Sequence, residues 1–195
     1  MSEPQRQETY EIPVHFPDTK EKLSYFVQGI LISVPLTIFF ETVARDYLYS
    51  VLPPHPASFV LITMAAPVIE EYFKAFPLFF RHAETPKGLF DLGFLTGLGF
   101  GISEFFVYVF LMKVEFLIRV PAVLFHAANT SIIAYGIGKG QTARYYLLAV
   151  ALHFSNNFFA EFGDLYLIGG LGAVLIAYYL SYRFYNETSA KYLIQ

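Results

Sequence analysis

The segment ASFVLITMAAPVIEEYFKAFPLFF, residues 57–80, decides the fold of this chain, because it is a long apolar run with charge near its middle. About 20 consecutive apolar residues are needed to cross the hydrocarbon of a bilayer as a helix. Glu70, Glu71 and Lys74 interrupt the run. An ionised side chain at the centre of a lipid-facing helix costs roughly 2.5–3.5 kcal/mol, so such residues usually line a cavity or a reaction site. The segment therefore predicts a membrane helix whose polar face points into the protein.

The rest of the sequence has the composition of a membrane protein. Hydrophobic residues make up 55% of the chain and charged residues 15%, whereas charged residues make up about 25% of soluble domains. We therefore predict an all-α polytopic membrane protein, a bundle of about six transmembrane helices. The expected spans are residues 23–40, 57–80, 88–112, 116–137, 144–161 and 165–185.

The expected domain organisation follows from these spans. Residues 1–22 form a polar cytoplasmic tail, 23–185 a single transmembrane helical domain and 186–195 a short C-terminal tail. Lysine and arginine collect on the cytoplasmic side of membrane proteins. With both termini cytoplasmic, the inner flanks hold nine of them and the outer flanks hold two. The nine are Arg6, Lys20, Lys22, Arg81, Lys87, Lys139, Arg144, Arg183 and Lys191, and the two are Arg45 and Lys113. We expect a multi-pass protein of the cell membrane with both termini cytoplasmic.

Ionisable residues from four different spans fall at one depth. Glu70, Glu104, His126 and His153 lie about 13, 16, 10 and 9 residues into their spans, which at 1.5 Å per residue places all four near the midplane. Span order alone does not make these helices neighbours. Their convergence on one polar cavity, together with Glu71, is therefore a prediction about packing.

Four ordered motifs give the chain a resemblance to a known family. They are Glu70-Glu71-x-x-Lys74, Phe100-x-x-x-Glu104 after a glycine-rich stretch, Arg119 with His126-x-x-x-Thr130, and His153-x-x-x-Asn157. This succession resembles the PrsW family of intramembrane proteases, in a wider superfamily with CAAX prenyl proteases and bacteriocin-processing membrane proteins. Those relatives usually show Glu-Glu-x-x-x-Arg, whereas Ala75 stands at that last position here. The resemblance implies a hydrolase that cleaves a membrane-protein substrate within the lipid bilayer.

Peptide hydrolysis gives these residues expected roles. A carboxylate can take a proton from water, as hydrolysis requires of a general base, and the preferred assignment gives this task to the Glu70/Glu71 pair. His126 would orient water or protonate the leaving amine. His153 and Asn157 would stabilise the oxyanion. Four supporting residues would set charge and orientation: Lys74, Glu104, Arg119 and Thr130.

A zinc-dependent version uses the same side chains. Two histidines and one glutamate form a known catalytic zinc set that leaves a coordination position for water. The cofactor is therefore none or zinc, and the ligands of a metal would come from Glu70, Glu71, His126 and His153. The His-Glu-x-x-His helix of zincins is absent from the sequence.

Several functions are excluded or left open by the composition. Absence of cysteine excludes thiolate metal sites and a cysteine nucleophile, and a net charge of −3 gives no indication of nucleic acid binding. Ser103 lies in Gly-Ile-Ser-Glu, not in a rhomboid Gly-x-Ser-Gly motif, and no aspartate is expected at mid-span. A proton-coupled transporter remains open, because membrane glutamates and histidines also relay protons. A non-catalytic membrane scaffold remains open as well.

Overall fold

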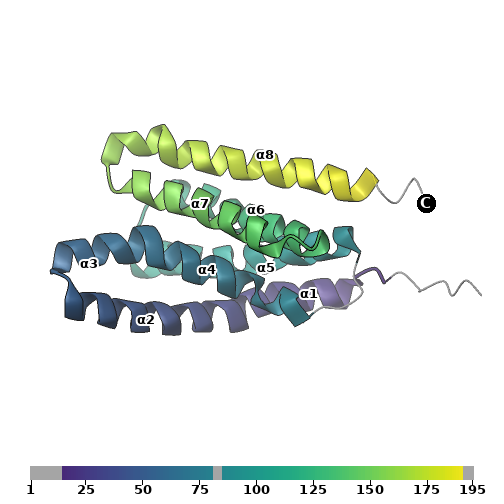
Figure 1. The fold of residues 1–195 in the computed structure, drawn as a ribbon, viewed down its shortest axis with the longest axis horizontal. Helices are drawn as coiled ribbons and strands as arrows, with labels where there is room; N and C mark the ends of the chain where they lie inside the picture. Colours follow the sequence, from purple (N-terminus) through teal and green to yellow (C-terminus); the bar gives the residue numbers. More distant parts are fainter. Residues whose placement is uncertain (1–14, 81–84, 191–195) are drawn as a thin grey trace, which may run out of the picture.

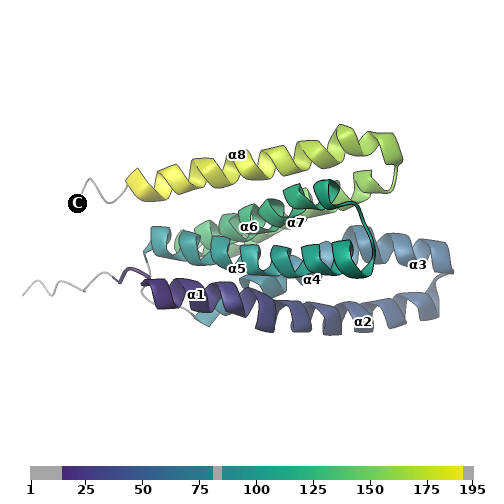
Figure 2. The same cartoon turned by 180° about the vertical axis from the view of Figure 1, so that it is seen from behind.

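All regular elements described by the computed structural model are helical, and the model describes residues 15–80 and 85–190. Within these residues the chain makes six antiparallel passes (Figures 1 and 2). The helices are α1 (Thr19–Gln28), α2 (Val34–Val51), α3 (Pro54–Val60), α4 (Ala66–Ala75), α5 (Pro86–Phe106), α6 (Phe116–Gly138), α7 (Thr142–Ala160) and α8 (Gly169–Ala190). The predicted all-α membrane fold is confirmed.

Four stretches are long and apolar enough to cross a membrane on their own: Thr19–Val51, Pro86–Leu111, Phe116–Gly138 and Gly163–Thr188. The two remaining passes, residues 54–80 and 142–160, lie beside them in the same bundle (Figures 1 and 2). These two passes carry Glu70 and His153, and α4 packs against α7. The chain is a multi-pass membrane protein.

The first pass is longer than the sequence predicted. Asp18 caps it by accepting a hydrogen bond from the backbone N–H of Glu21, so the helix begins at Thr19. It continues through a π-helical turn at Gly29–Ser33 and ends only at Val51. The span was predicted to end at residue 40, but the helix continues past Glu41, because one polar residue does not stop a helix. The prolines that follow Leu52 do, because a residue before proline avoids the helical conformation.

Several predictions fall on residues whose structure is not described. Residues 1–14 of the predicted N-terminal tail and 191–195 of the C-terminal tail lie outside the described ranges. The same holds for Arg6, Arg81 and Lys191, which enter the charge count. In the described part, α1 begins and α8 ends at the same end of the bundle (Figure 1).

Close packing of α5 against α6 positions half of the candidate site. A Cβ atom at Gly97 would lie 2.5 Å from the carbonyl oxygen of His126 and 2.6 Å from Oγ1 of Thr130. Only glycine permits this approach, which is the use of small residues at membrane helix interfaces. The contact brings the end of α5 that carries Glu104 to the middle of α6, where His126 lies.

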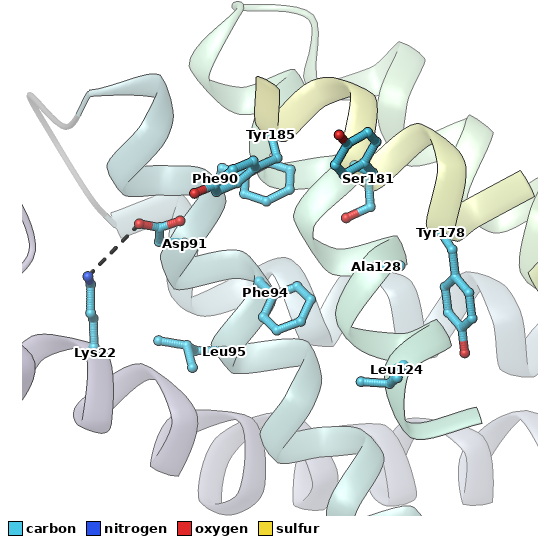
Figure 3. A pocket seen from close by; sticks show the side chains of 11 residues that line it. Lys22, Phe90, Asp91, Phe94, Leu95, Leu124, Ala128, Tyr178, Ser181 and Tyr185 are labelled. Atoms are coloured by element: carbon cyan, nitrogen blue, oxygen red, sulfur yellow. Dashed lines mark ion pairs between the residues drawn. The ribbon is translucent and has the colours of Figure 1, made fainter. Parts of the chain in front are cut away.

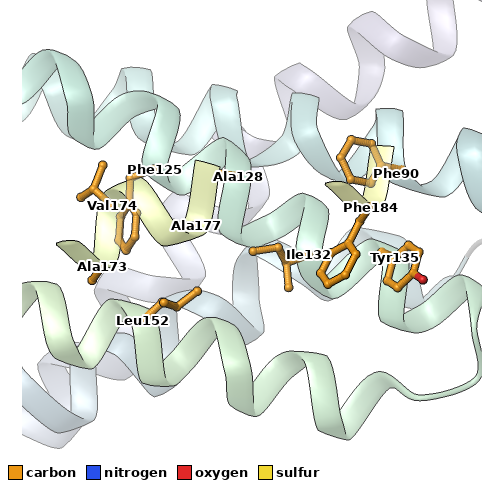
Figure 4. Packing of buried hydrophobic residues seen from close by; sticks show 10 residues of the cluster. All are labelled: Phe90, Phe125, Ala128, Ile132, Tyr135, Leu152, Ala173, Val174, Ala177 and Phe184. Carbon is orange, nitrogen blue, oxygen red and sulfur yellow. The ribbon is translucent and has the colours of Figure 1, made fainter. Parts of the chain in front are cut away.

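The main hydrophobic cluster lies where α5, α6, α7 and α8 meet (Figure 4). Its members are Phe90, Phe125, Ala128, Ile132, Tyr135, Leu152, Ala173, Val174, Ala177 and Phe184. Phe125 links this cluster to the polar residues, because its ring centroid lies 6.1 Å from that of His126 and 5.7 Å from that of His153. Both imidazoles are therefore held on one side by packed apolar side chains, which limits the rotamers they can adopt.

Candidate active site

A cavity of about 420 Å³ lies between the first five passes and is lined by side chains from each of them. Most of its wall is apolar. The polar and charged side chains that line it are Thr37, Glu41, Glu70, Glu104, Tyr108, Arg119, His126, His153, Asn156, Asn157 and Glu161. Five passes distant in sequence thus contribute to one site, and the predicted site residues Glu70, His126, His153 and Asn157 meet there.

On α4, two of the three predicted charges lie behind the cavity wall and compensate each other. The side chains of Glu71 and Lys74 are both 0% exposed, and Lys74 Nζ donates a hydrogen bond of 2.7 Å to Glu71 Oε1. Lys74 Nζ also lies 3.6 Å from Oε2 of Glu70. Burying an ion pair is tolerated only when both charges are paired and hydrogen-bonded. The geometry meets that condition for Glu71 and Lys74.

His126 is held at both ring nitrogens. Its Nε2 lies 2.6 Å from Oε2 of Glu104, and its Nδ1 lies 2.8 Å from Nζ of Lys74. An ionised carboxylate only accepts and an ammonium only donates, so Nε2 carries the hydrogen and Nδ1 is the acceptor. Glu104 is in turn bound by Nη2 of Arg119 at 3.1 Å. Arg119 and Glu104 therefore restrain the orientation of His126 in this arrangement, and their supporting roles in hydrolysis stay predictions.

His153 is held by a different carboxylate. Its Nδ1 donates to Oε1 of Glu71 at 2.8 Å, and the same oxygen is 3.4 Å from Nδ2 of Asn129. The opposite nitrogen, Nε2, lies 3.9 Å from Oε2 of Glu70. Glu71 thus contacts Lys74, His153 and Asn129, while Glu70 faces the cavity. The two adjacent glutamates therefore have different surroundings, a difference that the sequence did not reveal.

Glu70 lies at the point where the two histidines meet. Its Oε2 is 3.9 Å from Nδ1 of His126 and 3.9 Å from Nε2 of His153, and it is buried without a hydrogen-bond partner. One donor atom from each of these three residues lies within 4.8 Å of the others. A buried carboxylate oxygen without a partner, beside two imidazole nitrogens, has the donor chemistry of a zinc site.

The far nitrogens of both histidines strengthen this fit. Metal-binding histidines usually donate their other N–H to a carboxylate or carbonyl, which fixes the ring and raises its basicity. Glu104 accepts from His126 and Glu71 accepts from His153. One rearrangement is needed, because Nδ1 of His126 accepts from Lys74 and a nitrogen lone pair serves one partner at a time. The residues therefore fit a metal once the ammonium of Lys74 moves off that nitrogen.

Two predicted site residues are in different surroundings from those expected. Asn157 lines the cavity, but its Nδ2 donates to the carbonyl oxygen of Ile62 at 3.0 Å. One of its amide hydrogens is therefore used to join α7 to the π-helical turn before α4, and its oxyanion role stays a prediction. The hydroxyl of Thr130 donates to the carbonyl oxygen of His126 at 2.9 Å in the same helix. Thr130 acts in helix packing against Gly97 in this arrangement.

The sequence analysis missed two polar residues on α2. Thr37 and Glu41 line the cavity, and Oγ1 of Thr37 and Oε1 of Glu41 are buried without a hydrogen-bond partner. Their signal in the sequence is weak but present: Glu41 is a single carboxylate with apolar residues on both sides, Phe39-Phe40 before it and Val43-Ala44 after it. Ending the span at residue 40 concealed this pattern.

A larger cavity lies on the other side of α5 and contains none of the predicted site residues (Figure 3). It measures about 510 Å³, and its walls are mostly aromatic and aliphatic side chains of α5, α6 and α8. Lys22 and Asp91, 4.0 Å apart, lie at its edge. Its lining contains no histidine and no glutamate, whereas the smaller polar cavity holds both, so the smaller cavity is the candidate active site.

Comparison with known proteins bears on this site. The family described as PrsW family intramembrane metalloprotease matches residues 22–183, a range that includes every side chain of the polar cavity. No curated protein and no solved structure matches the chain.

Proposed function

Because this chain belongs to the PrsW family of intramembrane metalloproteases, we propose that it hydrolyses a peptide bond of a membrane-protein substrate in the polar cavity, with Glu70, His126 and His153 as zinc ligands. The observation that carries this proposal is the orientation of the two imidazoles. Each is fixed by a carboxylate at its far nitrogen, and each directs its other nitrogen toward the unpartnered oxygen of Glu70.

The remaining side chains prepare the site for hydrolysis. A bound zinc ion supplies Lewis acidity, which polarises the scissile carbonyl and makes water a nucleophile at neutral pH. Glu104 and Glu71 hold the imidazoles, while Arg119 and Lys74 compensate the charges of those two carboxylates. Carboxylates that hold metal-binding histidines, as Glu104 and Glu71 would here, typically contribute 10–100-fold to metal affinity or activity.

Substrate backbone would be bound by the amides on α7. Oδ1 of Asn156 lines the cavity without a hydrogen-bond partner, so it is available to accept an N–H of an extended peptide. Asn157 keeps one amide hydrogen beyond the one it gives to Ile62, and this hydrogen would serve the oxyanion in the zinc mechanism, because both ring nitrogens of His153 would be occupied by Glu71 and the metal. An extended peptide has unpaired backbone groups that need such partners in a water-poor site.

A metal-free mechanism is the second candidate, and the position of Lys74 favours it. The ammonium lies 2.7 Å from Glu71, 2.8 Å from Nδ1 of His126 and 3.6 Å from Glu70. A cation is therefore already present among the donor groups. In this version Glu70 is the general base, and the charge that zinc would carry is supplied by Lys74.

One experiment tests the function and separates the two mechanisms. Purified protein in liposomes is incubated with a pool of solubilised membrane proteins, and new N-termini are identified by mass spectrometry. The zinc proposal predicts cleavage that is lost after chelation, returns with zinc and is lost in Glu70→Gln. Glu115→Gln is the matched control, because Glu115 is exposed and does not line the cavity. Cleavage that survives full chelation supports the metal-free mechanism, and cleavage equal in wild type and Glu70→Gln contradicts both.

The orientation in the cell membrane is part of the proposal. We infer that both termini are cytoplasmic and that the described helices form a single transmembrane domain. Support comes from the nine-to-two charge bias and from α1 beginning where α8 ends (Figure 1). Tags attached at Met1 and at Gln195 should resist labelling from outside in intact cells, and labelling of either tag would overturn the orientation.

A further inference from the structure

The polar cavity has a second polar wall, on α2, that the proposed hydrolysis does not use. Thr37 and Glu41 are four residues apart in one helix, so their side chains lie on the same face. Both line the cavity that contains Glu70. The stacked rings of Phe40 and Phe73, with centroids 4.8 Å apart, hold α2 against α4 beside Glu41. The wall is therefore a fixed part of the cavity.

Both side chains have unused hydrogen-bonding capacity. Thr37 is 4% exposed, and its Oγ1 has no partner. A buried threonine in a helix usually donates to a carbonyl one turn earlier, as Thr130 and Thr96 do here. Oε1 of Glu41 is likewise buried and without a partner. An unsatisfied buried polar group costs about 1–3 kcal/mol, more when charged, so two such groups side by side indicate a ligand that satisfies them.

The charge of the cavity specifies the ligand. Its lining includes four carboxylates, on Glu41, Glu70, Glu104 and Glu161, and Arg119 is its one cationic side chain among the described residues. Arg119 is already engaged, because its Nη2 binds Glu104 and its guanidinium lies 3.6 Å above the ring of Tyr108. Glu41 thus has no ion-pair partner within 4 Å among the described residues, in a cavity whose lining carries more carboxylates than cations.

We propose that Thr37 and Glu41 form a subsite that binds a basic side chain of the substrate, lysine or arginine, close to the scissile bond. A lysine ammonium donates three hydrogen bonds and an arginine guanidinium donates five, while the carboxylate of Glu41 and the hydroxyl of Thr37 accept them. The aliphatic stem of such a side chain fits the apolar part of the lining, including Val34, Ile38 and Leu61. This subsite rests on the proposed function in that its ligand is part of a protein substrate.

Binding without catalysis tests the subsite directly. The probes are two acetylated tripeptide amides, Leu-Lys-Leu and Leu-norleucine-Leu, and their affinities are measured on the protein in nanodiscs, with empty nanodiscs subtracted. Wild type is expected to bind the lysine peptide about tenfold more tightly, the lower end of what a charged hydrogen bond contributes. Glu41→Gln should reduce this ratio to about one. Thr37→Val should reduce it about threefold, because it removes only a neutral acceptor.

A charge reversal and a matched control complete the test. Glu41→Arg should reverse the preference, so that the Leu-Glu-Leu peptide binds more tightly than the lysine peptide. Glu115→Gln removes an exposed carboxylate that does not line the cavity and should leave the ratio unchanged. A ratio near one in wild type overturns the subsite even if no variant folds, and so does an equal loss of preference in Glu115→Gln.

The two proposals fail in different ways. If the protein binds the lysine peptide selectively but generates no new N-termini, the subsite stands and the proposed hydrolysis is wrong. If wild type cleaves, its sites should share a lysine or arginine at one fixed position, and this enrichment should disappear in Glu41→Gln. Cleavage without that enrichment contradicts the subsite alone. Complete loss of cleavage in Glu41→Gln with an unchanged peptide-binding ratio would instead make Glu41 a general base.

Discussion

Replacing Lys74 by methionine tests whether the buried ion pair on α4 holds the site together. Methionine keeps an unbranched side chain of similar length but removes the charge. In the native protein the side chain is 0% exposed, with Nζ 2.7 Å from Glu71 and 2.8 Å from Nδ1 of His126. After the change, Glu71 keeps only His153 and Asn129 as donors, and its charge is buried without a cation. Removing one partner of a buried pair typically costs about 3–5 kcal/mol.

A double-mutant cycle isolates the pair from the loss of packing. Lys74→Met with Glu71→Gln removes both charges and leaves the amide to accept from His153, so the double variant should lose only about 1–2 kcal/mol relative to wild type. Glu71→Gln alone leaves Lys74 buried beside Glu70 and should cost about 2–3 kcal/mol. The coupling energy is therefore expected to be at least 3 kcal/mol, well above the roughly 0.5 kcal/mol within which independent sites add.

The assay is reversible unfolding of metal-free protein in mixed micelles with increasing sodium dodecyl sulfate, followed by circular dichroism. Metal-free protein is used because zinc would add its own binding energy to the folded state. The test compares the sum of the losses of unfolding free energy in the two single variants with the loss in the double variant. If the two agree within about 0.5 kcal/mol, the two charges do not act as a pair, and the stabilising role of Lys74 is refuted.

Three further predictions concern zinc, orientation and packing. Lys74→Met frees Nδ1 of a ligand histidine and removes a competing cation, so zinc affinity measured by chelator competition should rise about tenfold or more; a weaker affinity would contradict the assignment of ligands. Glu104→Gln loosens the other nitrogen of that histidine, so cleavage should fall about 10–100-fold while Glu115→Gln has no effect. Gly97→Ala forces α5 away from a backbone carbonyl of α6 and should lower unfolding stability by about 1–3 kcal/mol, whereas Gly172→Ala, with open space around it, should be neutral.

The sequence predicted the elements and the depth of the site because both depend on local rules. Apolar runs set the six passes, and residue counting placed Glu70, Glu104, His126 and His153 at one level. The structure brings these four into contact: Glu70 is 3.9 Å from both imidazoles, and Glu104 is 2.6 Å from His126. Counting worked because a helix advances by a constant 1.5 Å per residue, which leaves little freedom along the membrane normal.

The sequence did not predict which partner each polar group contacts, because the partner depends on the direction in which each side chain points around its helix axis. Three of the described passes contain π-helical turns, and two of these turns, Gly29–Ser33 and Leu61–Ala65, lie immediately before the segments that carry Glu41 and Glu70. A π turn holds an extra residue and therefore rotates all later side chains relative to an uninterrupted α-helix. The directions in which Glu41 and Glu70 point relative to the start of their passes therefore do not follow from a constant 100° step, whereas the separation of Glu70 from Glu71, both in α4, does. Such turns often occur at functional sites.

The balance of charges explains why this site needs a proton or a cation in addition to Lys74 and Arg119. Beside the two histidines, three carboxylates (Glu70, Glu71 and Glu104) face two cations (Lys74 and Arg119), which leaves one carboxylate in excess. Within the described residues, Oε2 of Glu70 and Oε2 of Glu71 are both buried without a hydrogen-bond partner, and of these two residues only Glu70 lines the cavity. An uncompensated charge near the midplane of a membrane is expensive, so the site must take up a proton or a cation. A proton on Glu70 would compensate the charge while Lys74 keeps its contact with Nδ1 of His126, as in the metal-free mechanism. A divalent cation would instead be held by Glu70, His126 and His153 once Lys74 moves off that nitrogen, and we favour this second arrangement because it uses the carboxylate and both imidazoles.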